Sequence, residues 1–228
     1  MKRFLQTASA IALLTLVAGS VSAQFRIRMP SVAGVWNPVV GAGATYEMQY
    51  SDGTKRNVDV AIVGKESVDG SDAYWLEISM TARHGEGQGE VIIKDLFSRD
   101  GDTLTLRRAV IQMPGQPPML MPDMMTQRMS SQDEPKVVDY RKNAEDLGKE
   151  TVTTPAGTFD CEHFRAKDGS GDAWLAPNAG GPYGLVKSVS DKGRTTMVMV
   201  KSVTDAKDKI TGTPQPFNPM GMGRPPQP

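Results

Sequence analysis

The 228-residue sequence predicts a mainly β, antiparallel fold, and three observations support this class. Apolar and polar residues alternate in several segments, which is the pattern of strands with one buried face. Turn signals such as Ser-Asp-Gly and Pro-Ala-Gly recur about every ten residues, closer together than helices would allow. A single stretch rich in Met and Pro interrupts the alternation, so we expect one short helical insertion in an otherwise β-rich domain.

The chain begins with a predicted signal peptide, residues 1–23. Lys2 and Arg3 form a basic start, an apolar run follows, and Val-Ser-Ala at residues 21–23 fits a cleavage site. A bacterial lipoprotein requires a Cys directly after its cleavage site, and this sequence has none there. We therefore expect a soluble mature chain that begins near Gln24 and works in the periplasm or outside the cell.

Composition argues against several kinds of partner. The formal net charge is zero, and about −2 without the two basic residues of the signal peptide. A nearly neutral chain gives no electrostatic reason to expect nucleic acid or an anionic membrane surface as a partner. The single Cys, Cys161, allows no intramolecular disulfide, so burial of a core must hold the fold.

An extended lead-in is expected over residues 24–38, anchored on the core by Trp36. One β-rich domain is expected over residues 39–209, and its first half is predicted to be a five-strand meander with tight turns. The apolar positions that alternate along these strands include Tyr46, Met48, Tyr50, Val58, Val60, Ile62, Tyr74, Leu76, Ile78, Met80, Leu104, Leu106 and Val110.

The Met/Pro-rich insertion covers residues 113–130. Residues 113–129 contain six Met and four Pro, and the Pro residues exclude a regular strand. A short helix is expected from about Pro122 to Met129. Three interpretations stay open: a soft-metal site for Cu(I), an adaptable apolar lid, or a loop whose Met side chains fill the core.

Short strands and turns return after residue 147. Strands are expected at residues 150–154, 158–166, 173–176, 185–190 and 195–203, separated by turns such as Pro-Ala-Gly at 155–157 and Asp-Gly-Ser-Gly-Asp at 168–172. From residue 210 to 228 the tail is rich in Pro, Gly and Met, and we expect it to be disordered.

This second half carries a resemblance to known proteins. Thr154–Phe159 with Cys161 and His163, then Trp174-Leu175, Pro177 and Pro182–Lys187, resemble motifs of uncharacterised bacterial secreted proteins with a TPAGTF hairpin and a PYGLVK segment. The architecture of that group is similar to the LolA/LolB-like lipoprotein-carrier fold. The resemblance implies a curved antiparallel sheet, or half-barrel, around an apolar cavity that an inserted helical segment closes.

No catalytic arrangement is evident in the sequence. Cys161 and His163 lie two apart, so a strand places them on one face, where they could be a nucleophile with its base, two metal ligands, or packing residues. Asp168, Ser170 and Asp172 imitate the start of a calcium loop, but the later positions do not fit. We favour packing and turn roles, and we expect no enzymatic activity, metal or cofactor.

The expected function is non-enzymatic binding of an apolar ligand, such as a lipid or the acyl chains of a lipoprotein, by a periplasmic or secreted protein. Two alternatives stay open: an envelope structural or interaction module without a ligand, and a copper-handling protein that uses its Met cluster. The candidate wall residues are Tyr46, Tyr50, Leu76, Ile78, Leu106 and Val110. The candidate lid residues are Met119, Met121, Met124, Met125 and Met129.

Overall fold

The computed structural model describes residues 34–81, 88–132, 136–190 and 193–217. The predicted signal peptide and most of the predicted lead-in lie outside the described residues, so cleavage after Ala23 stays a prediction. Among the described residues, no helix has both the length and the apolar character needed to cross a membrane.

The first half of the domain is the predicted meander. Its five strands pair in sequence order and antiparallel: β1 (Gly43–Tyr50), β2 (Lys55–Val68), β3 (Ser71–Thr81), β4 (Glu90–Asp100) and β5 (Thr103–Gln112). The turn between β2 and β3 shows why the turn signals were informative. Asp69 and Gly70 both have positive φ angles, 52° and 77°, a conformation that Asp-Gly pairs adopt readily in two-residue hairpins.

The second half is also antiparallel, and its strands are β8 (Ala144–Thr154), β9 (Gly157–Ala166), β10 (Gly171–Leu175), β11 (Leu185–Ser190) and β12 (Thr195–Val203). The last two match the predicted bounds residue for residue. β8 begins six residues earlier than predicted, at Ala144, in a stretch expected to be a surface connection. As an edge strand with one neighbour, β8 needs few apolar residues, and most of its side chains are exposed.

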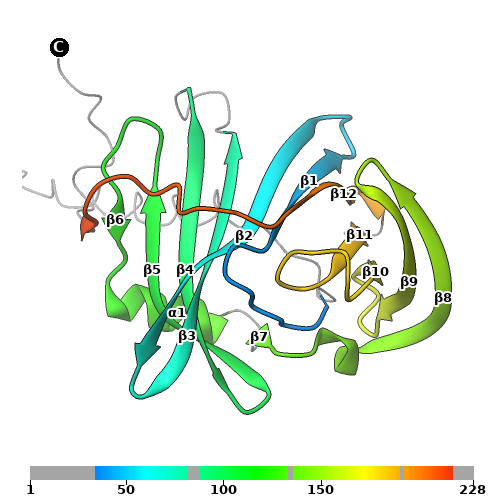
Figure 1. Ribbon diagram of the computed structural model, residues 1–228, viewed down its shortest axis with the longest axis horizontal. Helices are drawn as coiled ribbons and strands as arrows, with labels where there is room; N and C mark the ends of the chain where they lie inside the picture. The colour runs from blue at the N-terminus through cyan, green and yellow to red at the C-terminus, as the bar shows by residue number, and fades with distance from the viewer. Residues whose placement is uncertain (1–33, 82–87, 133–135, 191–192, 218–228) are drawn as a thin grey trace, which may run out of the picture.

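The two halves join because β12 pairs with β1, with Met199 opposite Tyr46. Within the described residues the strands form one 13-stranded, mostly antiparallel sheet, which includes the two-residue strands β6 (Met119–Leu120), β7 (Lys136–Val137) and β13 (Gln215–Pro216). Twelve strands follow the order β13-β6-β5-β4-β3-β2-β1-β12-β11-β10-β9-β8, and β7 pairs with β5 outside this order. The sheet does not close into a barrel. Figure 1 shows β4, β5 and β6 at one side, β8 and β9 at the other, and β1 and β2 between them. The predicted fold class, a mainly β open sheet with little helix, is confirmed.

The Met/Pro-rich insertion forms β6 (Met119–Leu120) and helix α1 (Asp123–Gln132). The helix is present as predicted and extends beyond residue 129. Backbone N–H groups of Met125 and Thr126 donate to the Pro122 carbonyl at its start, and α1 packs against β5. Pro118 and Pro122 flank β6, which limits it to two residues paired with β5. A second two-residue strand, β7 (Lys136–Val137), also pairs with β5.

The chain after β12 crosses the sheet, and we call residues 204–217 the C-terminal strap (Figure 1, orange to red). It ends in β13 (Gln215–Pro216), which pairs parallel with β6. The N–H of Gln215 donates to Pro118 and that of Phe217 to Leu120. The structure therefore differs from the predicted disorder over residues 210–217, because one neighbouring edge strand suffices to fix a Pro-rich segment. Residues 218–228 lie outside the described residues.

The sheet has two distinct faces. We call inner the face that carries the paired residues Val60 and Ile78, and outer the face that carries the paired residues Asp59 and Ser79. Buried apolar side chains from both halves of the sheet meet in one core cluster. The apolar inner face of a single sheet must be buried against something, either another part of the chain or a ligand.

An aromatic plug, consisting of Trp36, Tyr140 and Tyr183, fills the inner side. Trp36 is 6% exposed; its ring centroid lies 6.1 Å from Phe97 in an edge-to-face contact and 5.3 Å from Tyr183. The ring of Tyr140, in the short 3-10 helix Tyr140–Asn143, lies 6.1 Å from Tyr183. The N–H of Trp36 donates to Val138 at 2.7 Å. Trp36 thus anchors the lead-in on the core, as predicted.

Candidate functional site

Most predicted wall residues meet on the inner face. Tyr46, Leu76, Ile78 and Leu106 belong to the buried core cluster, and Tyr50 is half-buried against it. Val110 is buried outside that cluster, and the register explains why. Phe97 pairs with Leu106 but Leu96 pairs with Arg108, so an extra residue in β5 turns Val110 to the other face. Regular alternation in the sequence could not reveal this bulge.

The side chains of the inner face pack against one another. The Tyr46 hydroxyl donates to the Leu185 carbonyl at 3.0 Å, and burial raises the pKa of Tyr46 well above its usual value. Tyr46 therefore stays a neutral donor inside the core. The wall residues contact the chain's own side chains, and their role toward a ligand stays a prediction.

The predicted lid residues are distributed differently. Met119 and Met121 are half-buried, whereas Met124 is 66% and Met125 37% exposed; the Met129 side chain lies outside the described residues. Helix α1 instead buries Thr126, whose hydroxyl donates to the Pro122 carbonyl at 3.3 Å. Met124 and Met125 thus face solvent rather than the wall residues. The copper alternative for this cluster stays a prediction.

Replacing Met124 and Met125 together by Asp is expected to change the free energy of unfolding by less than about 1 kcal/mol. Both side chains are exposed, and acidic residues are favourable in the first turn of a helix. Urea denaturation and an environment-sensitive apolar dye measure the effect, with Thr126→Asp as the buried control that should destabilise strongly. A large change in dye binding with an intact β spectrum would instead favour a lid.

Cys161 and His163 both lie on β9, but their surroundings differ. The thiol is buried and donates weakly to the Phe159 carbonyl at 3.7 Å, and burial raises its pKa to about 11. A thiol in that state is a poor nucleophile. The His163 ring stacks on Trp174 with centroids 4.2 Å apart and lies between two carboxylates, 3.5 Å from Glu150 and 3.3 Å from Asp172. Cys161 is part of the buried core cluster, which fits the favoured packing role.

No group of three or more His, Cys, Asp or Glu within the described parts of the chain is placed to bind a metal ion. The stretch that imitates a calcium loop forms the hairpin turn between β9 and β10, as predicted. There the Asp168 carboxylate accepts from the Ser170 N–H at 2.8 Å. The sequence also contains a second His, His84, and a Gly-rich segment with glycines at 85, 87 and 89 that we interpret as a turn; residues 82–87 of this region lie outside the described residues.

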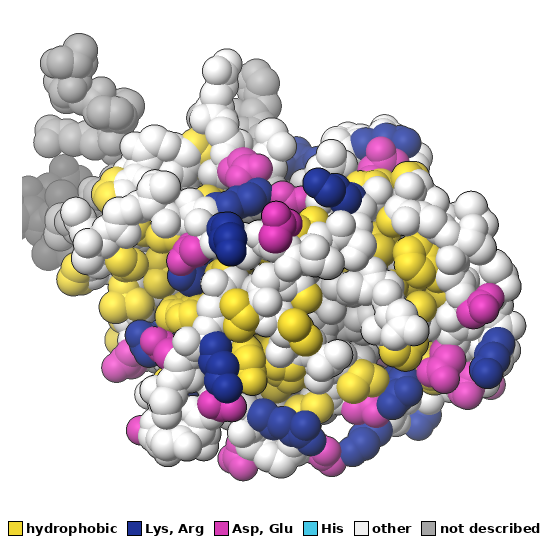
Figure 2. Space-filling model, viewed as in Figure 1, with side chains coloured by type: hydrophobic (Ala, Val, Ile, Leu, Met, Phe, Trp, Pro, Cys, Tyr) yellow, Lys and Arg dark blue, Asp and Glu magenta, His cyan; other side chains and the backbone are white. Residues whose placement is uncertain are grey.

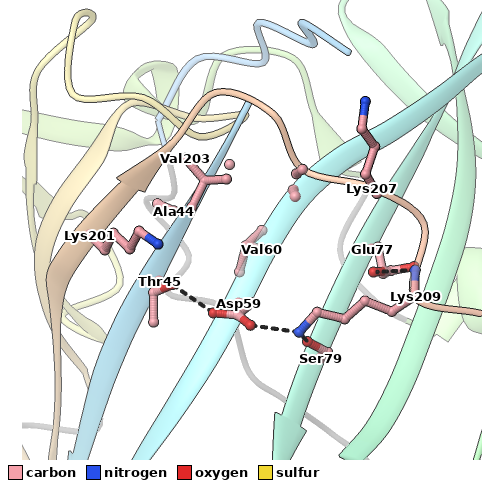
Figure 3. A pocket seen from close by; sticks show the side chains of 13 residues that line it. Ala44, Thr45, Asp59, Val60, Glu77, Ser79, Lys201, Val203, Lys207 and Lys209 are labelled. Atoms are coloured by element: carbon pink, nitrogen blue, oxygen red, sulfur yellow. Dashed lines mark hydrogen bonds and ion pairs between the residues drawn. The ribbon is translucent and has the colours of Figure 1, made fainter. Parts of the chain in front are cut away.

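A cleft of about 190 Å³ lies under the strap on the outer face (Figure 3). Strands β1, β2, β3 and β12 and the strap enclose it. Figure 2 shows acidic and basic side chains close together in the upper middle, where the strap crosses the strands in Figure 1. Its polar and charged lining includes Asp59, Glu77, Ser79, Lys201, Lys207 and Lys209.

Lys209 fixes the strap over this cleft. Its Nζ donates to Asp59 Oδ2 and Ser79 Oγ, both at 2.7 Å, and to Glu90 at 3.2 Å. Burial alone would raise the pKa of Asp59, but hydrogen bonds from Lys209 and Thr45 lower it below its usual value. We call Lys209 with these partners the Lys209 clasp. A second ion pair, Asp208 with Lys94, lies beside it.

Glu77 completes the anchor from the centre of β3. It is 4% exposed and accepts from the backbone N–H of Lys209 at 3.1 Å. Burial raises the pKa of Glu77 to about 7; the N–H of Lys209 opposes this shift, whereas the nearby Asp208 carboxylate adds to it. Deprotonation of Glu77 in the folded protein therefore costs more than in the unfolded chain.

The free energy of unfolding is expected to fall as pH rises from about 4.5 to about 7 because of Glu77. A carboxyl whose folded pKa is raised stabilises the fold below its unfolded pKa, and this stabilisation is lost as pH rises through the folded pKa. The loss should be on the order of 2 kcal/mol. Glu77→Gln, which keeps an acceptor for Lys209, should flatten this part of the stability–pH curve measured by urea denaturation. An unchanged slope would show that Glu77 titrates normally.

Sequence reasoning missed the strap, because Pro-rich composition predicted a free tail. A signal was nevertheless present. Asp59, Glu77 and Ser79 are polar residues in the middle of strongly apolar strands, and Lys209 follows in a charged run. Polar groups in central strands need partners, so they indicate that another segment covers the outer face.

Comparisons with known proteins found similarity at the level of structure only. The chain matches no family model and no curated protein. A protein of Parabacteroides distasonis ATCC 8503, provisionally described as a lipoprotein, aligns over 77% of this chain and 100% of its own, with 12% identity and a TM-score of 0.35. A Bacteroides fragilis NCTC 9343 protein, provisionally described as exported and with a YmcC-like fold, aligns over 74% and 99%, with 14% identity and a TM-score of 0.33. At TM-scores this low, nothing about the activity of this chain follows from either protein.

Proposed function

We propose that the chain is an exported, non-enzymatic protein of the cell envelope that works as an interaction module with a filled core. The observation that carries this proposal is the aromatic plug. Trp36 and Tyr183 are both more than nine-tenths buried and occupy the inner side of the sheet, where a carrier would hold its ligand. The export part of the proposal rests on the signal-peptide pattern of residues 1–23.

The surroundings of Cys161 and His163 support the proposal that the protein is not an enzyme. Cys161 is a buried, neutral thiol, and His163 is engaged by two carboxylates and a stacked Trp. Neither residue has the geometry of a nucleophile with its base, which must lie within hydrogen-bond reach of each other.

Binding of an apolar ligand such as a lipid or acyl chain is the second candidate, because the plug itself is apolar. The lead-in has few tethers: Trp36 donates to Val138, Asn37 donates to Pro182, and Gly34 accepts from Tyr140. If these contacts opened, apolar wall residues would become accessible. This role, which the resemblance to carrier folds implies, requires the plug to leave while the sheet stays folded.

Native mass spectrometry of protein purified from the envelope of an exporting host separates the two candidates. A filled core predicts the bare mass of the processed chain and no lipid in an organic extract. A stoichiometric lipid or acyl adduct, lost on denaturation, would contradict the filled-core proposal and favour the carrier.

A further inference from the structure

The cleft under the strap has a floor of small residues. Gly43 of β1 pairs with Ala61 of β2 on the outer face, and a Cβ at Gly43 would lie only 2.7 Å from the Ala61 Cβ. Position 43 therefore has no room for a side chain beyond glycine. Ala206 of the strap lies above Gly43 and Ala61, and its N–H donates to the Gly41 carbonyl. Three small residues thus leave an open volume of about 190 Å³.

This volume suits a small organic molecule but not a lipid. A protein cavity of about 150 Å³ is large enough for benzene. The cleft can accordingly hold a benzene-sized body with one attached group, whereas a long acyl chain exceeds it. A ligand of this size differs from the lipid of the carrier candidate, and its cleft lies on the opposite face of the sheet from the aromatic plug.

The charges around the cleft favour an anion. Asp59 is neutralised by Lys209, and Glu77 is engaged by the backbone N–H of Lys209. Lys201 on β12 and Lys207 on the strap line the same cleft, and neither forms an ion pair with any residue that the structure describes. In Figure 3, Lys201 extends over β1, whereas Lys207 extends away from Asp59 and Lys209. Both are flexible, exposed cations that can turn toward a bound anion.

We propose that this cleft binds a small organic anion that consists of a carboxylate or phosphate group on a benzene-sized apolar body. The apolar body lies on Gly43, Ala61 and Ala206, and the anionic group pairs with Lys201 and Lys207. The Lys209 clasp holds the roof of the site in place.

Titration calorimetry at low salt tests the site with benzoate, phenyl phosphate, inorganic phosphate and the neutral analogue benzyl alcohol. At least one of the two organic anions should bind at least tenfold more tightly than both benzyl alcohol and inorganic phosphate. The affinity should also fall as salt is added, because the two Lys residues are exposed. Equal affinity for benzyl alcohol, equal affinity for inorganic phosphate, or no binding of either organic anion would overturn the proposal.

Variants locate the binding to this cleft. Lys201→Gln with Lys207→Gln should weaken binding of the organic anion at least tenfold, whereas Lys149→Gln on β8 should leave it unchanged. Ala206→Leu should fill the cleft and abolish binding, whereas Thr204→Leu, on the same strap outside the cleft, should not. Circular dichroism checks that each variant is folded, and the Lys pair decides the matter if Ala206→Leu is not. Unchanged affinity in the double Lys variant would place the binding elsewhere.

Discussion

Replacing Trp36 by Ala is expected to lower the free energy of unfolding by about 3–5 kcal/mol, the usual cost of deleting a large buried aromatic side chain. Trp36 is the only large side chain that the described lead-in inserts into the core, and it contacts Phe97 and Tyr183. Its removal leaves a cavity on the inner face that the rigid strands cannot collapse to fill. Urea denaturation followed by circular dichroism measures the loss.

The matched control for this substitution is Val40→Ala. Val40 lies four residues after Trp36, before β1, and is 51% exposed, so its replacement should change stability by less than about 0.5 kcal/mol. A loss below about 1 kcal/mol for Trp36→Ala, comparable to the control, would show that the lead-in is not part of the folded core.

Replacing Lys209 by Ala is expected to cost about 2–3 kcal/mol and to release the strap. Hydrogen bonds to charged groups contribute more than neutral ones, but the Lys209 and Asp59 side chains are 36% and 39% exposed, so solvent reduces the effect. The larger signature should appear in amide hydrogen exchange. The N–H groups of Ala206 and Gln215, which are hydrogen-bonded in the strap, should lose most of their protection while β2 and β3 keep theirs.

Lys207→Ala is the control for the clasp, since Lys207 lies on the same strap, is exposed and has no ion pair with a described residue. It should leave both stability and strap protection unchanged within about 0.5 kcal/mol. Equal effects of the two substitutions would show that the strap is held by its backbone contacts and not by the clasp.

Local sequence patterns predicted the strands and most turns well. The bounds of β11 and β12 follow directly from runs of apolar residues between turn signals, and the Asp69-Gly70 hairpin follows from the φ preferences of its residues. Each of these features depends on neighbours in the sequence. Helix α1 was likewise predictable, because Pro122 marks its start and good helix formers follow.

Features that depend on distant contacts were not predictable in the same way. The bulge in β5 that turns Val110 to the outer face depends on how β5 pairs with β4. The pairing of β13 with β6 depends on where the strap ends. The candidate site shows the same limit. Alternation correctly placed Tyr46 and Leu76 on the inner face, but it could not show that Tyr183, more than 100 residues away, belongs to the same buried cluster.

The most direct test of a filled core is amide hydrogen exchange at Trp36 compared with Val60 in the buried centre of β2. The Trp36 N–H donates to Val138, so it can exchange only when the plug opens. If the plug is part of the core, both amides should exchange through global unfolding, with the same opening free energy. Exchange of Trp36 at an opening free energy several kcal/mol lower, with Val60 fully protected, would show a plug that leaves an intact sheet and would contradict the filled core.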